Sequence, residues 1–147
     1  MQSIHIKISL IGDKQTGKTR FTRLLNNIDR TEYIPTLGCD VVLKDKTYNN
    51  KKYSLNIWDC AGDERYLGLG KEYLINSHYI LLFTNNDTNA TNCFKQWIPE
   101  NINYHTINSN DLNVDEHLNR ALNQLQHLQQ PNSFLEHNFT NTLSVNV

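Results

Sequence analysis

The sequence of 147 residues has little of what several classes of protein require. It carries 14 basic and 15 acidic residues, a net charge of −1, so it lacks the basic excess of a nucleic-acid-binding surface. It has no apolar run long enough to span a membrane, and its first residues do not follow a signal-peptide pattern. Myristoylation and prenylation motifs are also missing, which favours a protein without a lipid anchor.

Cysteine is scarce and has no recognisable pattern. The three cysteines are widely spaced, and the six histidines do not combine with them in the spacing of a zinc site. An odd number of separated cysteines fits reduced thiols, so we expect an intracellular protein, in the cytoplasm, the nucleus or both. The length fits one domain over residues 1–147.

A phosphate-binding pattern stands near the start of the sequence. It lies between an alternating apolar run at 4–10, which predicts a strand, and a helix-like run at 20–25. Its glycines let the backbone aim N–H groups at phosphate oxygens, while its Lys reaches the β- and γ-phosphates and its last Thr ligates Mg²⁺. A chance glycine-rich turn is the weaker alternative in this context. The predicted phosphate-binding residues are Gly12, Asp13, Lys14, Gln15, Thr16, Gly17, Lys18 and Thr19.

Alternating strands and helices are predicted behind this loop. We expect strands at 41–43 and 53–58, joined by a turn at Asn49-Asn50, then a buried strand at 79–83 and weaker strands at 104–107 and 133–135. Helices are expected at 92–97 and from an Asn113 cap to a point before Pro131. This order predicts an α/β fold, a P-loop NTPase sandwich with a mostly parallel sheet and one antiparallel edge hairpin. Sixteen asparagines from Asn76 onward make the second half less well specified.

A second motif follows the strand at 53–58. Asp59 stands at the expected carboxyl end of this strand, and Gly62 comes three residues later. Beside a P-loop, such an Asp holds Mg²⁺, often through water, and the N–H group of such a glycine meets a γ-phosphate. Taken alone, Asp59 would more often be an ordinary strand-ending residue. The P-loop makes the metal role the better interpretation.

Together these motifs resemble those of the Ras-superfamily small GTPases. Residues 12–19 are similar to the first motif of the family, 36–38 to switch I and 58–65 to switch II. The variants within these motifs resemble Ran most closely and Rab next, over residues 4–97. The resemblance implies a six-stranded sheet with five helices. The sequence stops where the last helix of such a protein begins, so we expect a G domain truncated at its C-terminus.

The resemblance also implies a function and assigns roles. The protein would be a switch that binds GTP, GDP and Mg²⁺, and Lys18 would grip the phosphates. Thr19 and Thr36 would ligate Mg²⁺, with Asp59 supporting the metal. Gly62 would sense the γ-phosphate. Residues 30–38 and 60–73 would be the switch regions that contact protein effectors and regulators.

Two departures from the family concern hydrolysis. Asp63 occupies the position of the glutamine that orients the attacking water, and Lys14 occupies a position that is usually glycine. A carboxylate cannot donate an amide N–H and brings negative charge toward a triphosphate, while the Lys14 side chain would crowd the water. We therefore expect a GTPase, converting GTP to GDP and phosphate, of weak activity. Thr36, Gly62 and Asp63 are the candidate catalytic residues.

A further departure concerns base recognition. Residues 108–111 resemble the N-K-x-D motif, in which the Asp selects guanine, so Asn108 and Asp111 are the candidate base-binding residues. Ser109 stands where the family has lysine, and a chance match in an Asn-rich stretch is the alternative. The rival function is therefore a nucleotide-free or relaxed-specificity pseudo-GTPase that acts as a protein-interaction module.

Overall fold

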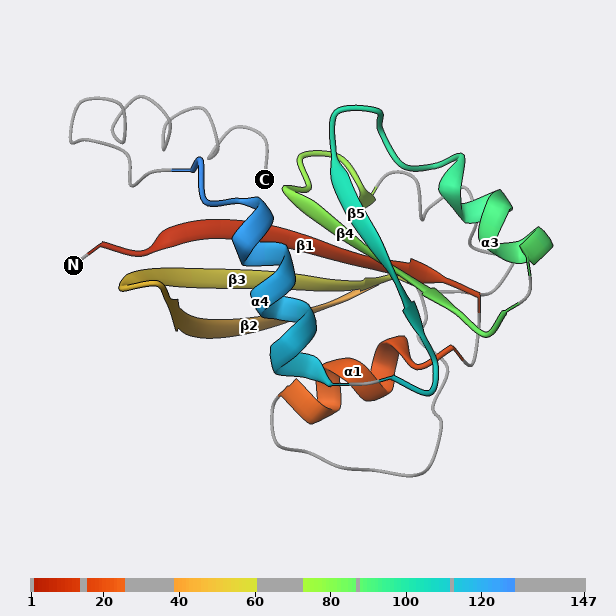
Figure 1. The fold of residues 1–147 in the computed structure, drawn as a ribbon, viewed down its shortest axis with the longest axis horizontal. Coiled ribbons are helices and arrows are strands. Elements are labelled where there is room, and N and C mark those ends of the chain that lie inside the picture. Colours follow the sequence, from red (N-terminus) through yellow and green to blue (C-terminus); the bar gives the residue numbers. More distant parts are fainter. Residues whose placement is uncertain are drawn as a thin grey trace.

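A computed structural model of the chain describes residues 2–13, 16–25, 39–60, 73–86, 88–111 and 113–128. Strands and helices alternate along these residues, as predicted (Figure 1). The elements in chain order are β1 (Ile4–Gly12), α1 (Lys18–Leu25), β2 (Cys39–Tyr48), β3 (Lys51–Cys60), β4 (Tyr79–Thr84), α3 (Thr88–Lys95), β5 (Asn103–Asn108) and α4 (Val114–Gln124).

The strands within these ranges form one sheet with the order β2-β3-β1-β4-β5. β1 pairs in parallel with both β3 and β4, and β4 pairs in parallel with β5. β2 pairs antiparallel with β3 at one edge. The predicted α/β fold, with a mostly parallel sheet and one antiparallel edge hairpin, is therefore confirmed. The strand expected at 133–135 lies outside the described residues.

The hairpin turns where the sequence predicts it. Asn49 and Asn50 have φ angles of 50° and 62°, a conformation that asparagine tolerates and that suits the twist of paired strands. Both strands are longer than predicted, since they pair from Cys39 opposite Cys60 to Tyr48 opposite Lys51. The apolar pattern marks only part of each strand, whereas backbone pairing continues through the more polar residues that flank it.

Two helices cover one face of the sheet. Phe21 of α1 and Leu118 and Leu122 of α4 belong to one buried cluster with the inward side chains of the strands. Figure 1 shows α4 crossing in front of β1 and β3, and Gln126, just beyond the helix, donates a hydrogen bond to Tyr53 Oη at 3.3 Å. Leu24, within the helix-like run predicted at 20–25, is only half-buried.

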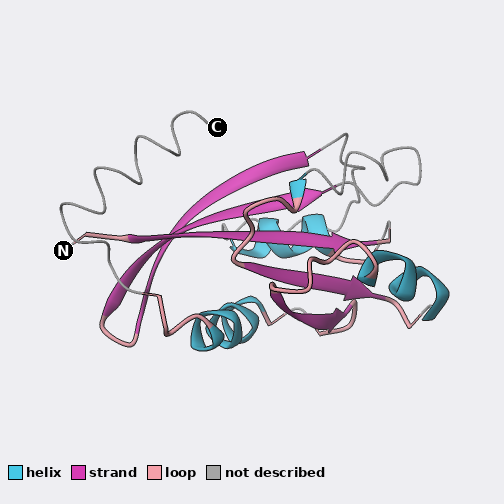
Figure 2. Cartoon of the chain, turned by 90° about the horizontal axis from the view of Figure 1, so that it is seen from above, coloured by secondary structure: helices cyan, strands magenta, loops and turns pink. Residues whose placement is uncertain are grey.

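The other face of the sheet carries α3. Its Phe94 packs in a second buried cluster with Ile80 and Leu82 of β4. Figure 2 shows α3 near one end of the molecule, well separated from α4. The helix predicted at 92–97 is thus present, but it runs from Thr88 to Lys95. The predicted bounds are wrong because the first turn is polar and adds nothing to an apolar pattern, which begins only at Phe94.

The start of α4 was predicted from its capping residue. Asn113 Oδ1 accepts a hydrogen bond from the Glu116 N–H at 3.2 Å, the contact expected of an Asn N-cap. The regular helix ends at Gln124, and Leu125 and Leu128 continue the apolar stripe through turns. Over the described ranges, no helix is long and apolar enough to cross a membrane.

Candidate functional site

The carboxyl ends of four parallel strands meet at one edge of the sheet. β1 ends at Gly12, β3 at Cys60, β4 at Thr84 and β5 at Asn108. Ligands of open α/β sheets bind in the crevice outside these ends. The fold therefore brings the P-loop, the Asp59 motif and the segment 108–111 to the same edge, although they lie far apart in the sequence.

Both glycines of the P-loop have backbone conformations that other residues rarely adopt. Gly12 has a φ of 144° and Gly17 a φ of 99°. Gly12 also lies against β4, since a Cβ atom added to it would stand 2.4 Å from the carbonyl oxygen of Phe83. Glycine at position 12 is therefore required both by the turn and by the close approach of two strands.

Lys18 is held inside the loop that precedes it. Its side chain is buried, and its Nζ donates to the carbonyl oxygens of Gly12 at 2.7 Å and Asp13 at 2.8 Å. Thr16 Oγ1 lies 3.5 Å from the same Nζ and donates to the carbonyl of Asp13. Lys18 is also the first residue of α1, so the ammonium group and the positive end of the helix lie together. This arrangement favours an anionic ligand.

Burial makes the charge of Lys18 costly. Desolvation lowers the pKa of its ammonium group from 10.5 to about 8, while the carboxylates of Asp59 and Asp13 act in the opposite direction. The group remains mostly protonated at neutral pH. A phosphate in the loop would add negative charge beside this buried cation and offset the cost of its burial.

Thr19 and Asp59 contact each other across 40 positions of sequence. Thr19 Oγ1 donates to Asp59 Oδ2 at 2.8 Å, and Asp59 is buried. Hydroxyl and carboxylate oxygens are hard groups of the kind that Mg²⁺ prefers, either as direct ligands or as partners of its ligands. The residues present therefore fit the predicted metal.

The candidate base-binding segment forms an ordered turn after β5. Asn108 Nδ2 donates to Asn86 Oδ1 at 2.9 Å, and Asn108 Oδ1 accepts from the Asn110 N–H at 3.0 Å. The Asp111 N–H donates to the carbonyl of Asn108 at 2.8 Å. Asn108 thus ties the loop after β5 to the loop after β4. The Asp111 side chain is 62% exposed, so its carboxylate is accessible to a ligand.

Sequence reasoning missed a buried polar chain beside this turn. Tyr79 Oη lies 2.8 Å from His105 Nδ1, and His105 Nε2 lies 3.0 Å from His117 Nδ1. Burial, followed by the charges of Arg120 and His117, lowers the pKa of His105 from 6.5 to about 4. A signal was present, because His105 alternates with Ile107 in β5 and His117 adjoins the apolar stripe of α4. Both patterns place a histidine on the side of its element that faces the core.

Five of the predicted site residues lie outside the described ranges. Of the P-loop, the described residues include Gly12, Asp13 and 16–19. The predicted roles of the five residues outside these ranges stay predictions. The site residues outside the described ranges are Lys14, Gln15, Thr36, Gly62 and Asp63.

Comparison with known families agrees with this geometry. Residues 7–115 match the model described as "Ras of Complex, Roc, domain of DAPkinase". The chain belongs to the Ras superfamily of small GTPases, as a Roc-type domain. The match begins in β1 and ends at the start of α4, so it includes the P-loop, Asp59 and the segment 108–111.

Individual relatives carry Ras-related and GTP-binding names. The chain is 31% identical over 121 residues to Ras-related protein RIC1 of Oryza sativa subsp. japonica, covering 81% of this chain and 60% of the relative. It is 29% identical over 132 residues to GTP-binding protein YPTM2 of Zea mays, covering 88% of this chain and 65% of the relative. It is 33% identical over 110 residues to Ras-related protein RABD2a of Arabidopsis thaliana, covering 74% of this chain and 54% of the relative.

These relatives confirm the Ras-superfamily resemblance at a coarser level than the motifs suggested. The chain spans between 54% and 65% of the length of the three relatives. Their names are of the Ras-related, Rab and YPT kind, so the likeness to Ran stays a prediction.

Proposed function

We propose that this Roc-type chain is a guanine-nucleotide-binding switch of the Ran/Rab type. The observation that supports it best is the buried Lys18 ammonium, which lies within the P-loop at the edge where Thr19 meets Asp59. A cation, a helix N-terminus and a hydrogen-bonded hydroxyl–carboxylate pair at one sheet edge suit a nucleotide phosphate accompanied by Mg²⁺.

In this proposal each predicted phosphate-binding or metal-binding residue has one task. Lys18 binds the β- and γ-phosphate oxygens, and the backbone N–H groups of the loop surround them. Thr19, with Thr36, would supply oxygen ligands to Mg²⁺, and Asp59 would support the metal through its hydrogen bond with Thr19. Mg²⁺, when bound, neutralises the charge that the β- and γ-phosphates share. Gly62 offers its N–H to the γ-phosphate.

Asp111 is the proposed base reader. An ionised carboxylate has two oxygens that accept hydrogen bonds, and guanine presents two neighbouring donors, the N1–H and the 2-amino group. Adenine offers an acceptor at N1, which would face a carboxylate oxygen without a proton between them. Such a mismatch leaves polar groups unpaired and lowers affinity. Asn108 holds the turn that carries Asp111.

The switch regions, residues 30–38 and 60–73, are the proposed contact sites for effectors and regulators. Nucleotide-dependent ordering of such segments is a common way to couple a bound phosphate to a partner. We propose the cytoplasm, the nucleus or both as the place of action, consistent with the free cysteines Cys39, Cys60 and Cys93.

Titration with a fluorescent GDP analogue tests the binding function. In the presence of Mg²⁺ we expect submicromolar binding that GTP displaces and ATP does not. Chelation of Mg²⁺ with EDTA is expected to weaken the binding by roughly tenfold or more, because the phosphates lose their counter-charge. Displacement by GTP and ATP alike would retain the P-loop role and reject Asp111 as a base reader. No binding would reject the switch and favour a protein-interaction module.

Hydrolysis is proposed to be slow because of Asp63 and Lys14. Asp63 offers no amide N–H to orient water, and its negative charge opposes a triphosphate. Replacing both residues, Asp63→Gln with Lys14→Gly, is expected to raise the single-turnover rate by roughly tenfold or more. Phosphate release from a preformed GTP complex measures this rate directly.

A matched control separates a local effect from a general change of charge. Lys95→Ala removes an exposed lysine of α3 and should leave the hydrolysis rate unchanged. An unaltered hydrolysis rate in the double variant would mean that residues other than Asp63 and Lys14 make hydrolysis slow. A wild-type rate as fast as that of ordinary small GTPases would refute slow hydrolysis without touching the binding proposal.

A further inference from the structure

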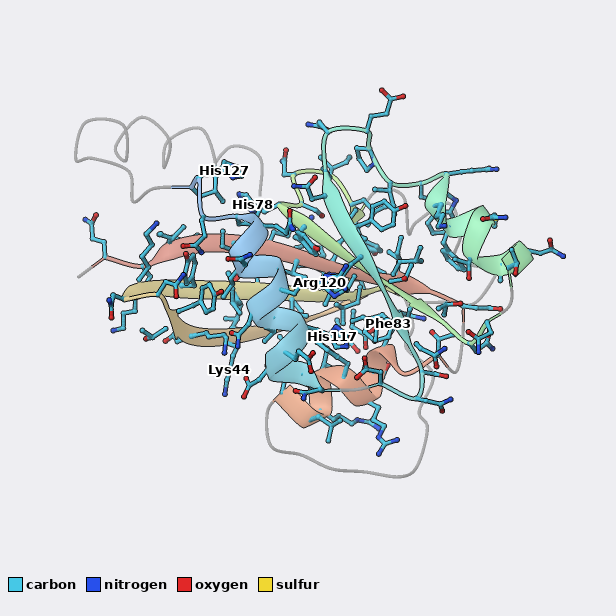
Figure 3. All side chains as sticks on the ribbon, viewed as in Figure 1. Lys44, His78, Phe83, His117, Arg120 and His127 are labelled. Carbon is cyan, nitrogen blue, oxygen red and sulfur yellow. The ribbon has the colours of Figure 1, made fainter. Side chains whose placement is uncertain are left out.

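The buried polar chain ends on the residue proposed to read the base. From β4 and β5 it continues to α4, where His117 Nε2 lies 3.2 Å from the carbonyl oxygen of Asp111 and 3.4 Å from its carboxylate Oδ2. Tyr79, His105 and His117 are buried, whereas the Asp111 carboxylate is exposed. Figure 3 labels His117 and Arg120 on α4, beside the strand that carries His105. The chain thus connects the core to the candidate base site.

The chemistry of the partners fixes the direction of the last hydrogen bond. The carbonyl and the ionised carboxylate of Asp111 only accept hydrogen bonds, so His117 Nε2 must carry a proton and donate. This holds whether the ring is neutral or charged. His117 is therefore a donor to Asp111 in either protonation state.

The rest of the chain follows for neutral rings. A neutral His117 that donates through Nε2 accepts through Nδ1, so His105 Nε2 must donate to it. His105 then accepts through Nδ1, and the Tyr79 hydroxyl donates to that atom. Every proton points toward Asp111. Hydrogen bonds aligned in this way polarise one another and fix both ring orientations.

The charges around the chain suit this arrangement. His105 is neutral at pH 7, since burial and the nearby Arg120 and His117 lower its pKa to about 4. Burial also raises the pKa of the Tyr79 hydroxyl, which keeps its proton available. The groups in contact with His117 are His105 of β5 and Asp111 of the following turn, while Arg120, on the same helix as His117, acts on His105 through its charge.

We propose that His117 is a positioning residue for guanine selection. It holds the backbone and the carboxylate of Asp111 in one orientation, with Tyr79 and His105 fixing its own ring. Ser109 stands where the family motif has a lysine, so His117 provides this chain with a restraint on the base site that the motif does not include. The inference rests on the proposed function, because it gives Asp111 a base to read.

Two substitutions of His117 test the role. The amide nitrogen of His117→Gln can reach the place of Nε2 and donate to Asp111, whereas the side chain of His117→Asn is too short. We expect His117→Asn to lower GDP and GTP affinity by roughly tenfold with little change in the weak binding of ATP. His117→Gln is expected to restore most of the preference for GTP over ATP. Competition against the fluorescent GDP analogue gives each dissociation constant.

A general loss of structure is distinguished by a control and by a spectrum. Gln126→Ala removes the hydrogen bonds of the Gln126 side chain to Tyr53 Oη and to the Leu122 carbonyl, at the far end of α4 from Asp111, and should leave the nucleotide preference unchanged. Nitrogen-15 spectra of the wild-type imidazoles at pH 7.5 are expected to show the Nε2–H tautomer for both His105 and His117. This second measurement needs no variant to fold.

The outcomes distinguish failure of the His117 role from failure of the guanine recognition on which it rests. Equal loss of ATP and GDP binding in His117→Asn, or an Nδ1–H tautomer at His117, would overturn the positioning role and leave guanine binding intact. Asp111→Asn provides the other control, because an amide matches guanine poorly and should reduce the GTP preference. If wild type shows no such preference, or Asp111→Asn does not change it, guanine reading fails and the role of His117 fails with it.

Discussion

Replacing Lys18 by alanine is expected to weaken the binding of GDP and GTP by roughly a hundredfold or more. Its buried Nζ makes two short hydrogen bonds within the P-loop, so it is already directed at the centre of the loop. Hydrogen bonds from a cation to phosphate oxygens contribute about 1.5–3 kcal/mol each, and two of them account for this factor. The fluorescent GDP titration measures it.

Lys46→Ala is the matched control for the loss of a lysine. Lys46 forms an ion pair with the exposed carboxylate of Asp115 at 3.3 Å, far from the P-loop in the sequence and on the strand at the sheet edge. Its loss should leave nucleotide affinity within about twofold. Equal affinities of wild type and Lys18→Ala would show that the P-loop does not bind phosphate, and would favour the protein-interaction module.

The pH dependence of binding provides a second readout of Lys18. Because its pKa is about 8, GDP affinity should fall as the pH rises above 8 and the ammonium loses its proton. Stability of the unliganded chain should respond in the opposite sense. Between pH 8 and 10.5 the unfolded chain binds more protons at Lys18, so the contribution of this residue to the free energy of unfolding rises by about 3 kcal/mol. Both trends should vanish in Lys18→Ala.

Gly12→Ala is expected to lower the free energy of unfolding by about 2–5 kcal/mol. The φ of 144° is unfavourable for alanine, and its Cβ would overlap the Phe83 carbonyl oxygen at 2.4 Å. That oxygen belongs to the backbone of the neighbouring strand, paired with Gly12 itself, so it cannot move without opening the sheet. Urea denaturation followed by circular dichroism measures the change.

His5→Ala serves as the control for this substitution. His5 lies on the same strand but is exposed. Its replacement should therefore change the free energy of unfolding by less than about 0.5 kcal/mol. A Gly12→Ala protein as stable as wild type would mean that β1 and β4 do not approach as closely at Phe83 as the geometry indicates. If Gly12→Ala lost nucleotide binding without losing stability, glycine at this position would be needed for binding the nucleotide and not for folding.

Local signals explain which parts of the fold were predictable. The alternation of Ile4, Ile6 and Ile8 with polar residues identifies β1. The Asn113 cap identifies the start of α4 from a signal that spans only a few residues. The Asn49-Asn50 turn is likewise a property of two residues. Each of these features depends on neighbours in the chain, which is why the sequence alone indicates it.

Contacts between distant residues were predictable only where a motif links them. The Thr19–Asp59 contact follows from two motifs that together imply a metal site, although 40 positions separate the residues. No motif links His105 to His117 or either residue to Tyr79. Their contacts arise because β4, β5 and α4 pack together, and such packing is decided by the whole core.

The strand order also determines when β1 can pair with its neighbours during synthesis of the chain. β1 precedes the other described strands, yet it lies between β3 and β4, and Ile6, Ile8 and Leu10 are fully buried there. A ribosome must add residues 13–78 before β4 begins, which takes several seconds at about 5–20 residues per second. The edge of this apolar strand that pairs with β3 has no partner until residue 60 is made, and the edge that pairs with β4 waits for the whole of that time. Synthesis of this chain therefore creates a window for aggregation in which molecular chaperones would be most useful.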